Sequence, residues 1–182
     1  MKKYSEDYTL ETITDEKGRE KEVAVYKGDY FNISFNDGTI TDFRKTALLL
    51  FAALTILHVS AGFLNNLGMF QFYVAIPYVT AFFPLIYLAA GILHIPKPKQ
   101  KYQRDEVGLS FERMKTSVMT LLIMLGIGLL GALVFLVFFS SPAQWLKEII
   151  FLALEGLSFT AGYVLSRQLQ KLKIQKIENT ST

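Results

Sequence analysis

Two ionisable residues lie inside long apolar stretches of this chain, where such side chains are rare. His58 falls in the apolar run 46–64, and Glu155 falls in the run 149–165. A charged side chain in hydrocarbon costs at least about 2.5 kcal/mol, so residues of this kind mark candidate functional sites. An imidazole beside a carboxylate can also exchange protons near neutral pH. His58 and Glu155 are therefore the first candidates for an intramembrane polar site.

The two residues are expected at the same depth. Asn65 follows His58 by seven residues, and Glu148 precedes Glu155 by seven, so each candidate lies about 10 Å from the same end of its helix. The side chains can meet if the two helices are neighbours. We favour a buried contact that fixes helix register, because polar contacts between membrane helices are mostly packing features. A proton- or ion-handling role and a polar pocket for a ligand or a partner's span remain alternatives.

Polar residues follow at the predicted outer mouth of these helices. Asn65, Asn66 and Glu148 could extend a polar pocket there. They also fit ordinary turn and first-turn positions, with Glu148 placed to complement the helix dipole, and this interpretation is preferred. Pro77 and Pro84, seven residues apart in the second apolar run, predict kinks on one helix face. They indicate either a hinge or, as we favour, a static bend.

The elements that carry these residues are four apolar runs. A bilayer core of about 30 Å takes about 20 residues of helix, and only helices or closed barrels satisfy their backbone groups in lipid. The sequence therefore predicts an all-α membrane protein with an antiparallel four-helix transmembrane bundle in residues 46–166. Its four spans are residues 46–64, 70–93, 118–139 and 149–165.

Basic residues predict the orientation of the bundle. Of the 19 lysines and arginines, 18 lie in the N-terminal segment, in the loop 94–117 or beyond the last span. Basic residues near span ends stay on the cytoplasmic side. We therefore expect a multi-pass protein of the cell membrane with a cytoplasmic N-terminus and a cytoplasmic C-terminus. The lipid bilayer is its first partner.

The three cytoplasmic segments differ in pattern. Residues 1–45 hold three runs rich in Val, Ile, Thr, Tyr and Phe, separated by turn residues, which predicts a small β-meander. Loop 94–117 predicts an extended stub and then a short interfacial helix. The basic tail 167–182 is expected to continue the fourth helix as an amphipathic turn or two. Its charge indicates contact with anionic lipid rather than nucleic acid.

The composition limits the chemistry. There is no cysteine, no clustered set of metal ligands and no hydrolase or phosphate-binding motif. We expect no metal, no cofactor and no enzymatic activity. The favoured function is a non-enzymatic accessory or regulatory subunit of a membrane assembly, with a membrane-protein partner or a homo-oligomer. The alternative is a small proton- or ion-coupled transporter that uses His58 and Glu155.

Overall fold

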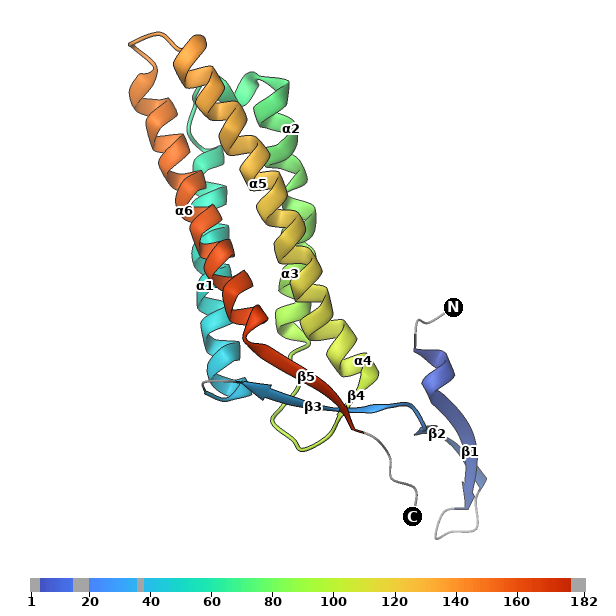
Figure 1. The fold of residues 1–182 in the computed structure, drawn as a ribbon. Helices are drawn as coiled ribbons and strands as arrows, with labels where there is room; N and C mark the ends of the chain where they lie inside the picture. Colours follow the sequence, from blue (N-terminus) through green and yellow to red (C-terminus); the bar gives the residue numbers. More distant parts are fainter. Residues whose placement is uncertain (1–3, 15–19, 36–37, 178–182) are drawn as a thin grey trace.

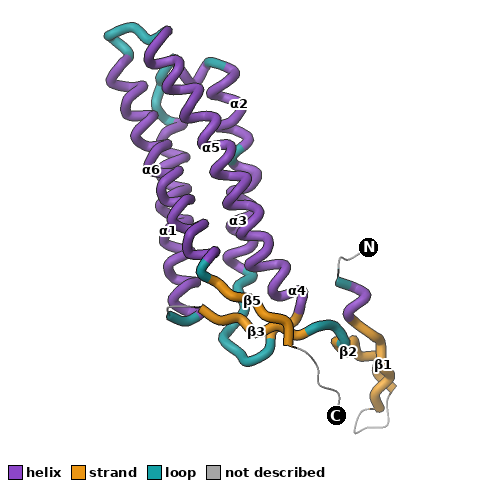
Figure 2. The backbone as a smooth tube through the Cα atoms, viewed as in Figure 1, coloured by secondary structure: helices purple, strands orange, loops and turns teal. Residues whose placement is uncertain are grey.

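Four long apolar helices and two small sheets make up the computed structural model, which describes residues 4–14, 20–35 and 38–177. The helices run side by side along one axis, and both sheets lie at one end of them (Figure 1). We call this the sheet end of the bundle. The opposite end carries only short connections, residues 63–71 and 139–144, and is called the turn end (Figure 2).

The first helix, α1 (Ile40–Gly62), begins with a reciprocal cap. The Asp42 amide donates to the Thr39 hydroxyl, and the Asp42 carboxylate accepts from the Thr39 amide at 3.2 Å. Two donors that have no partner within the helix are thereby satisfied. The short 3₁₀ turn η2 (Gly68–Phe70) then connects α1 to the second span.

Prolines divide the second span into α2 (Phe72–Thr80) and α3 (Phe82–Leu93), with the break at Ala81. The ring of a proline clashes with the carbonyl four residues earlier. For Pro84 that residue is Thr80, where α2 ends. Pro77 likewise frees the Tyr73 carbonyl, and the backbone of Gly131 on the next helix packs so closely there that a Cβ would lie 2.8 Å from Tyr73 O.

The third span is longer than the sequence predicts. A short helix α4 (Arg104–Val107), a π-helical turn η3 (Gly108–Glu112) and α5 (Arg113–Phe138) form one helix of 35 residues. The predicted interfacial helix is therefore the first part of this span. Buried Val107, Phe111 and Met114 continue the apolar face of α5, which explains the absence of a break near 117. The fourth span is α6 (Trp145–Gln170).

The predicted three-stranded meander is wrong in its pairing. After the 3₁₀ turn η1 (Ser5–Asp7), strands β1 (Tyr8–Thr14) and β2 (Glu20–Tyr26) form an antiparallel hairpin. Strand β3 (Tyr30–Phe35) instead pairs with β4 (Tyr102–Gln103) and with β5 (Leu172–Ile177). Ile33 is buried against the helix ends, so packing on the bundle decides where β3 pairs. The turn predicted between β1 and β2 lies outside the described residues.

The tail prediction is corrected in the same way. The helix α6 continues to Gln170, as expected, but Leu172 begins a strand rather than another helical turn. Leu172 and Ile174 alternate with lysine and glutamine, which is the period-2 pattern of a strand. They lie opposite Phe35 and Ile33 of β3. The sheet β4-β3-β5 thus ties together the three polar segments of the chain, although the end of the tail, 178–182, is not described.

The helices pack as neighbours in the order α1, α6, α5 and then α2 with α3. Most of the core lies toward the sheet end, and a smaller cluster of Ala61, Val74, Ala132 and Phe151 lies toward the turn end. Large apolar side chains on the outside, including Ile56, Phe83 and Leu130, are more than half exposed. Each span is long and apolar enough to cross a membrane.

Candidate functional site

His58 and Glu155 are in direct contact in the bundle interior. His58 Nδ1 lies 2.9 Å from Glu155 Oε1 and 3.1 Å from Oε2. His58 has no exposed surface and Glu155 is 4% exposed. The contact forms because α1 packs along α6, which brings these two residues of equal depth together. His58 Nδ1 faces a carboxylate and therefore carries the ring proton. In a neutral imidazole, Nε2 is then a free acceptor. Nε2 has no partner among the described residues.

Aromatic rings cover the pair. The centroid of the His58 ring lies 4.4 Å from that of Tyr78 and 4.8 Å from that of Phe82. The Tyr78 hydroxyl donates to the His58 carbonyl at 3.0 Å, which fixes the break region of the second span against α1. Ser158, one turn beyond Glu155, donates to the Leu54 carbonyl at 3.4 Å. These contacts seal the two ionisable groups from water.

Gly62 allows Tyr78 to reach α1, because a Cβ there would overlap the Tyr78 hydroxyl oxygen. We expect Gly62→Ala to lower the free energy of unfolding by about 1–3 kcal/mol, the range for overpacking. In Gly62→Ala/Tyr78→Phe the overlapping oxygen is absent, so part of the loss should be recovered. Thermal unfolding in detergent measures both. Strictly additive effects of the two substitutions would contradict this explanation.

A second buried contact lies at the turn end. The Glu148 carboxylate accepts from Asn66 Nδ2 at 2.7 Å and from the Gly68 amide at 2.9 Å. Glu148 has no exposed surface, and Asn66 is 1% exposed. Gly68 is required because a Cβ would lie 2.6 Å from Glu148 Oε2. The Glu148 carboxylate therefore holds the connection between α1 and α2 onto the start of α6.

Asn65 has a different role from Asn66. Its side chain is not buried, and only its carbonyl is used, accepting from Lys147 Nζ at 3.2 Å. Of the three predicted mouth residues, the structure thus joins Asn66 and Glu148 and leaves Asn65 in the turn. Both prolines are buried, and the backbone break lies between them at Ala81.

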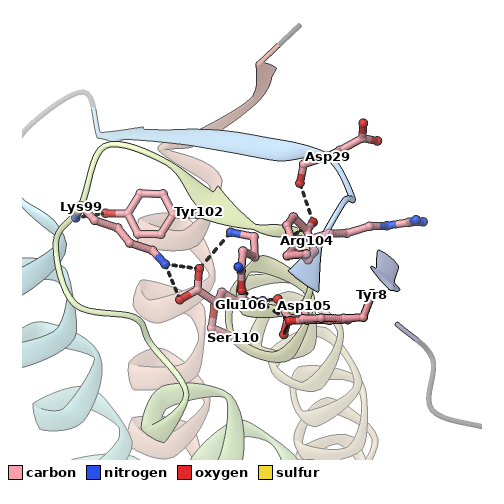
Figure 3. A network of polar contacts seen from close by, with 10 residues as sticks. Tyr8, Asp29, Lys99, Tyr102, Arg104, Asp105, Glu106 and Ser110 are labelled. Atoms are coloured by element: carbon pink, nitrogen blue, oxygen red, sulfur yellow. Dashed lines mark hydrogen bonds and ion pairs between the residues drawn. The ribbon is translucent and has the colours of Figure 1, made fainter. Parts of the chain in front are cut away.

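The sequence did not reveal a polar network at the sheet end, where the hairpin meets α4 (Figure 3). The Tyr8 hydroxyl donates to Asp105 Oδ2 at 2.9 Å. The Tyr26 hydroxyl accepts from the Arg104 amide at 2.9 Å and donates to the Asp29 carbonyl at 2.7 Å. The Tyr8 and Tyr26 rings pack edge to face at 5.2 Å. Two tyrosines thus attach the base of the hairpin to the helix.

The same region caps the third span. Glu106 Oε2 accepts from the Gln103 amide at 2.9 Å, which closes a capping box at the start of α4. Lys99 pairs with Glu106 at 2.6 Å, and the Tyr102 hydroxyl accepts from the Lys99 amide (Figure 3). A glutamate three residues after Gln103 was the available signal for this helix start.

The phenol of Tyr8 provides a pH test of the hairpin attachment. Burial raises the pKa of Tyr8 to about 12, and the hydrogen bond to Asp105 adds to this. A raised pKa means that the contribution of the phenol is fully present below pH 10 and is lost as pH rises through 12. Tyr8→Phe should therefore remove one late-titrating phenol from the ultraviolet absorbance titration. Loss of a phenol that titrates near 10 would contradict the contact.

The described residues contain no group of three or more His, Cys, Asp or Glu side chains that could hold a metal ion. His94 lies at the sheet end of α3, where its Nδ1 contacts the Ala90 carbonyl at 2.7 Å. Comparisons with protein families, curated proteins and solved structures give no match to this chain. Any function proposed for this chain therefore depends on the arrangement of its own residues.

Proposed function

We propose that this chain is a multi-pass protein of the cell membrane, with four spans and both termini on the cytoplasmic side. The outward-facing apolar side chains of the four helices support a hydrocarbon environment. Of the 15 lysines and arginines in the described residues, 14 also lie in the segments that the sheet end gathers. Under the positive-inside rule, this end faces the cytoplasm.

We further propose that the chain is a non-enzymatic accessory subunit of a membrane assembly, and the hairpin β1–β2 is the observation that carries this. Strand residues are exposed along almost the whole hairpin, except where Tyr8 and Tyr26 meet the bundle. Leu10 is 67% exposed and Ile13 is 50% exposed. A two-stranded hairpin is at best marginally stable in water. A partner that covers it would stabilise it.

A hollow beside the hairpin supports a docking role. It has a volume of about 750 Å³ and is lined by Tyr4, Tyr8 and Leu10 on the hairpin side and by Leu109 and Arg113 on the helix side. Apolar and aromatic walls with a few polar groups are typical of binding sites. The hollow can accept an apolar side chain of a partner that also contacts the exposed strand β1.

The charge of the strands favours a protein partner. The two strands hold three glutamates (Glu11, Glu20 and Glu22) and one lysine (Lys21), a net charge of −2. The inner leaflet is itself negative, so it does not attract these strands. A membrane-protein subunit or a second copy of this chain suits the hairpin better.

Photo-crosslinking in the native membrane tests this role. A photoreactive residue at Leu10 lines the hollow, and one at Thr12 lies two residues further along β1, outside the hollow. We expect one discrete protein adduct from position 10 and a much weaker one from position 12. An adduct of twice the chain mass would identify a homo-oligomer. Equal, diffuse labelling from both positions would contradict a docking site.

A second function, proton- or ion-coupled transport, is favoured by one observation. His58 Nε2 is buried and has no partner among the described residues, so it can accept a proton. Glu155→Gln separates the two functions. A carrier should lose transport at normal expression, whereas a structural contact should lose stability and leave activity in proportion to the folded protein. The sealed position of the pair favours the structural role.

A further inference from the structure

Besides the hollow next to the hairpin, Arg113 lines two further adjoining depressions on the outside of the bundle. A groove of about 380 Å³ runs between α3 and α5, lined by Phe83, Pro84 and Tyr87 on one side and by Ser117 and Thr120 on the other. A smaller hollow of about 200 Å³ continues toward the sheet end and includes Glu112. Arg113 and Thr116 line both, so the two form one continuous surface.

The polarity of this surface changes along its length. The groove between α3 and α5 has apolar and aromatic side chains from α3 along one side, and hydroxyls from α5 along the other. The hollow adds a carboxylate beside the guanidinium. In the described part of the chain, neither Glu112 nor Arg113 has an ion-pair partner. A groove with one apolar wall that ends in an unpaired cation and an unpaired anion fits an amphiphile with a zwitterionic head.

The depth of the residues fits a phospholipid. A hydrocarbon core of about 30 Å takes about 20 residues of helix, so counting back from Phe138, the end of α5, places its cytoplasmic edge near Met119. Arg113 lies six residues further along, about 9 Å, which is the headgroup layer. Thr116 and Thr120 lie closer to the acyl chains, and Phe83 lies beside them in the groove.

We propose that this surface is a binding site for phosphatidylethanolamine of the cytoplasmic leaflet. The Arg113 guanidinium donates to the lipid phosphate in the bidentate geometry that arginine favours. The Glu112 carboxylate accepts from the primary ammonium of the headgroup. One acyl chain follows the groove along Phe83 and Tyr87. The carboxylate selects ethanolamine, because a glycerol headgroup has no charge for it and a choline ammonium has no N–H to donate.

This proposal rests on the bilayer placement proposed above but not on a protein partner. Native mass spectrometry of the purified chain in mild detergent tests it, with phosphatidylethanolamine, phosphatidylglycerol and phosphatidylcholine of identical acyl chains added singly. We expect the ethanolamine lipid to bind at least about fivefold more tightly than either of the others. Failure of the chain to extract with membranes would instead contradict the bilayer placement.

Three variants assign the contacts. Glu112→Gln should bring the ethanolamine lipid down to the level of the glycerol lipid and leave the latter unchanged or stronger. Arg113→Gln should weaken both by about tenfold, the effect of one charge-assisted hydrogen bond. Lys115→Gln removes the same charge on the same helix from outside this surface, so it should change neither. Size-exclusion profiles check that all three are folded.

Several results would overturn the proposal. Equal binding of the three lipids, or stronger binding of the glycerol lipid, would show no ethanolamine selection. An equal effect of Lys115→Gln and Arg113→Gln would show only general attraction to basic residues. Displacement of the lipid by millimolar inorganic phosphate would show a free-anion site rather than a lipid site.

Discussion

Replacing His58 alone with leucine is expected to lower the free energy of unfolding by about 3 kcal/mol or more. The substitution leaves the Glu155 carboxylate in the bundle interior without the partner that now lies 2.9 Å away. Breaking a buried pair from one side costs about 3–5 kcal/mol, because the remaining group stays uncompensated. Thermal unfolding in detergent, followed by size-exclusion chromatography of the protein that remains folded, measures this loss of stability.

The double variant His58→Leu/Glu155→Leu is the matched control. It removes both polar groups and leaves similar volume, so we expect most of the stability to return, as it does when buried pairs are replaced by apolar residues. The coupling between the two positions should then exceed about 1 kcal/mol. Effects that simply add would show that the contact between α1 and α6 does not hold the bundle together.

The second large effect is expected for Glu148→Ala, at about 3 kcal/mol. This substitution leaves Asn66 Nδ2 and the Gly68 amide buried without their acceptor, and each unsatisfied donor costs about 1–3 kcal/mol. Because the carboxylate holds residues 66–68, proteolysis at the turn end should also become faster in the variant. Limited digestion from the outer side of reconstituted vesicles measures this.

Lys147→Ala is the control for Glu148→Ala. Lys147 precedes Glu148 on α6 and contacts the same turn through the Asn65 carbonyl at 3.2 Å, but this hydrogen bond is exposed. Exposed contacts contribute little, about 0–1 kcal/mol. Similar losses in the two variants would contradict the role given to the buried carboxylate.

The sequence predicts equal depths for His58 and Glu155 because helix geometry relates position in the chain to depth, and it leaves their contact conditional on which helices are neighbours. His58 lies seven residues before Asn65 and Glu155 lies seven residues after Glu148, and a regular rise per residue converts that count into a distance. The four spans followed from length and apolar character. What remained open was whether α1 and α6 are neighbours, since that depends on packing between segments about 100 residues apart.

The strands show the limit of sequence patterns. The runs that became β1, β2 and β3 were found by their composition, yet β3 pairs with residues 102–103 and with β5, near the end of the chain. Pairing of this kind depends on which partners the folded bundle brings close. The tail was expected to be helical because Leu165, Leu169 and Leu172 fit a helical period, although Leu172 and Ile174 also fit a strand period.

The proposed function depends on the hairpin and the turn end facing opposite sides of a bilayer. The chain has no cysteine, so a single cysteine can be placed at exposed Thr12 on β1 or at Ser141 in the turn between α5 and α6. A membrane-impermeant maleimide on intact cells should label Ser141→Cys and reach Thr12→Cys only after permeabilisation. Labelling of Thr12→Cys in intact cells, with Ser141→Cys protected, would contradict the cytoplasmic hairpin and the accessory role built on it.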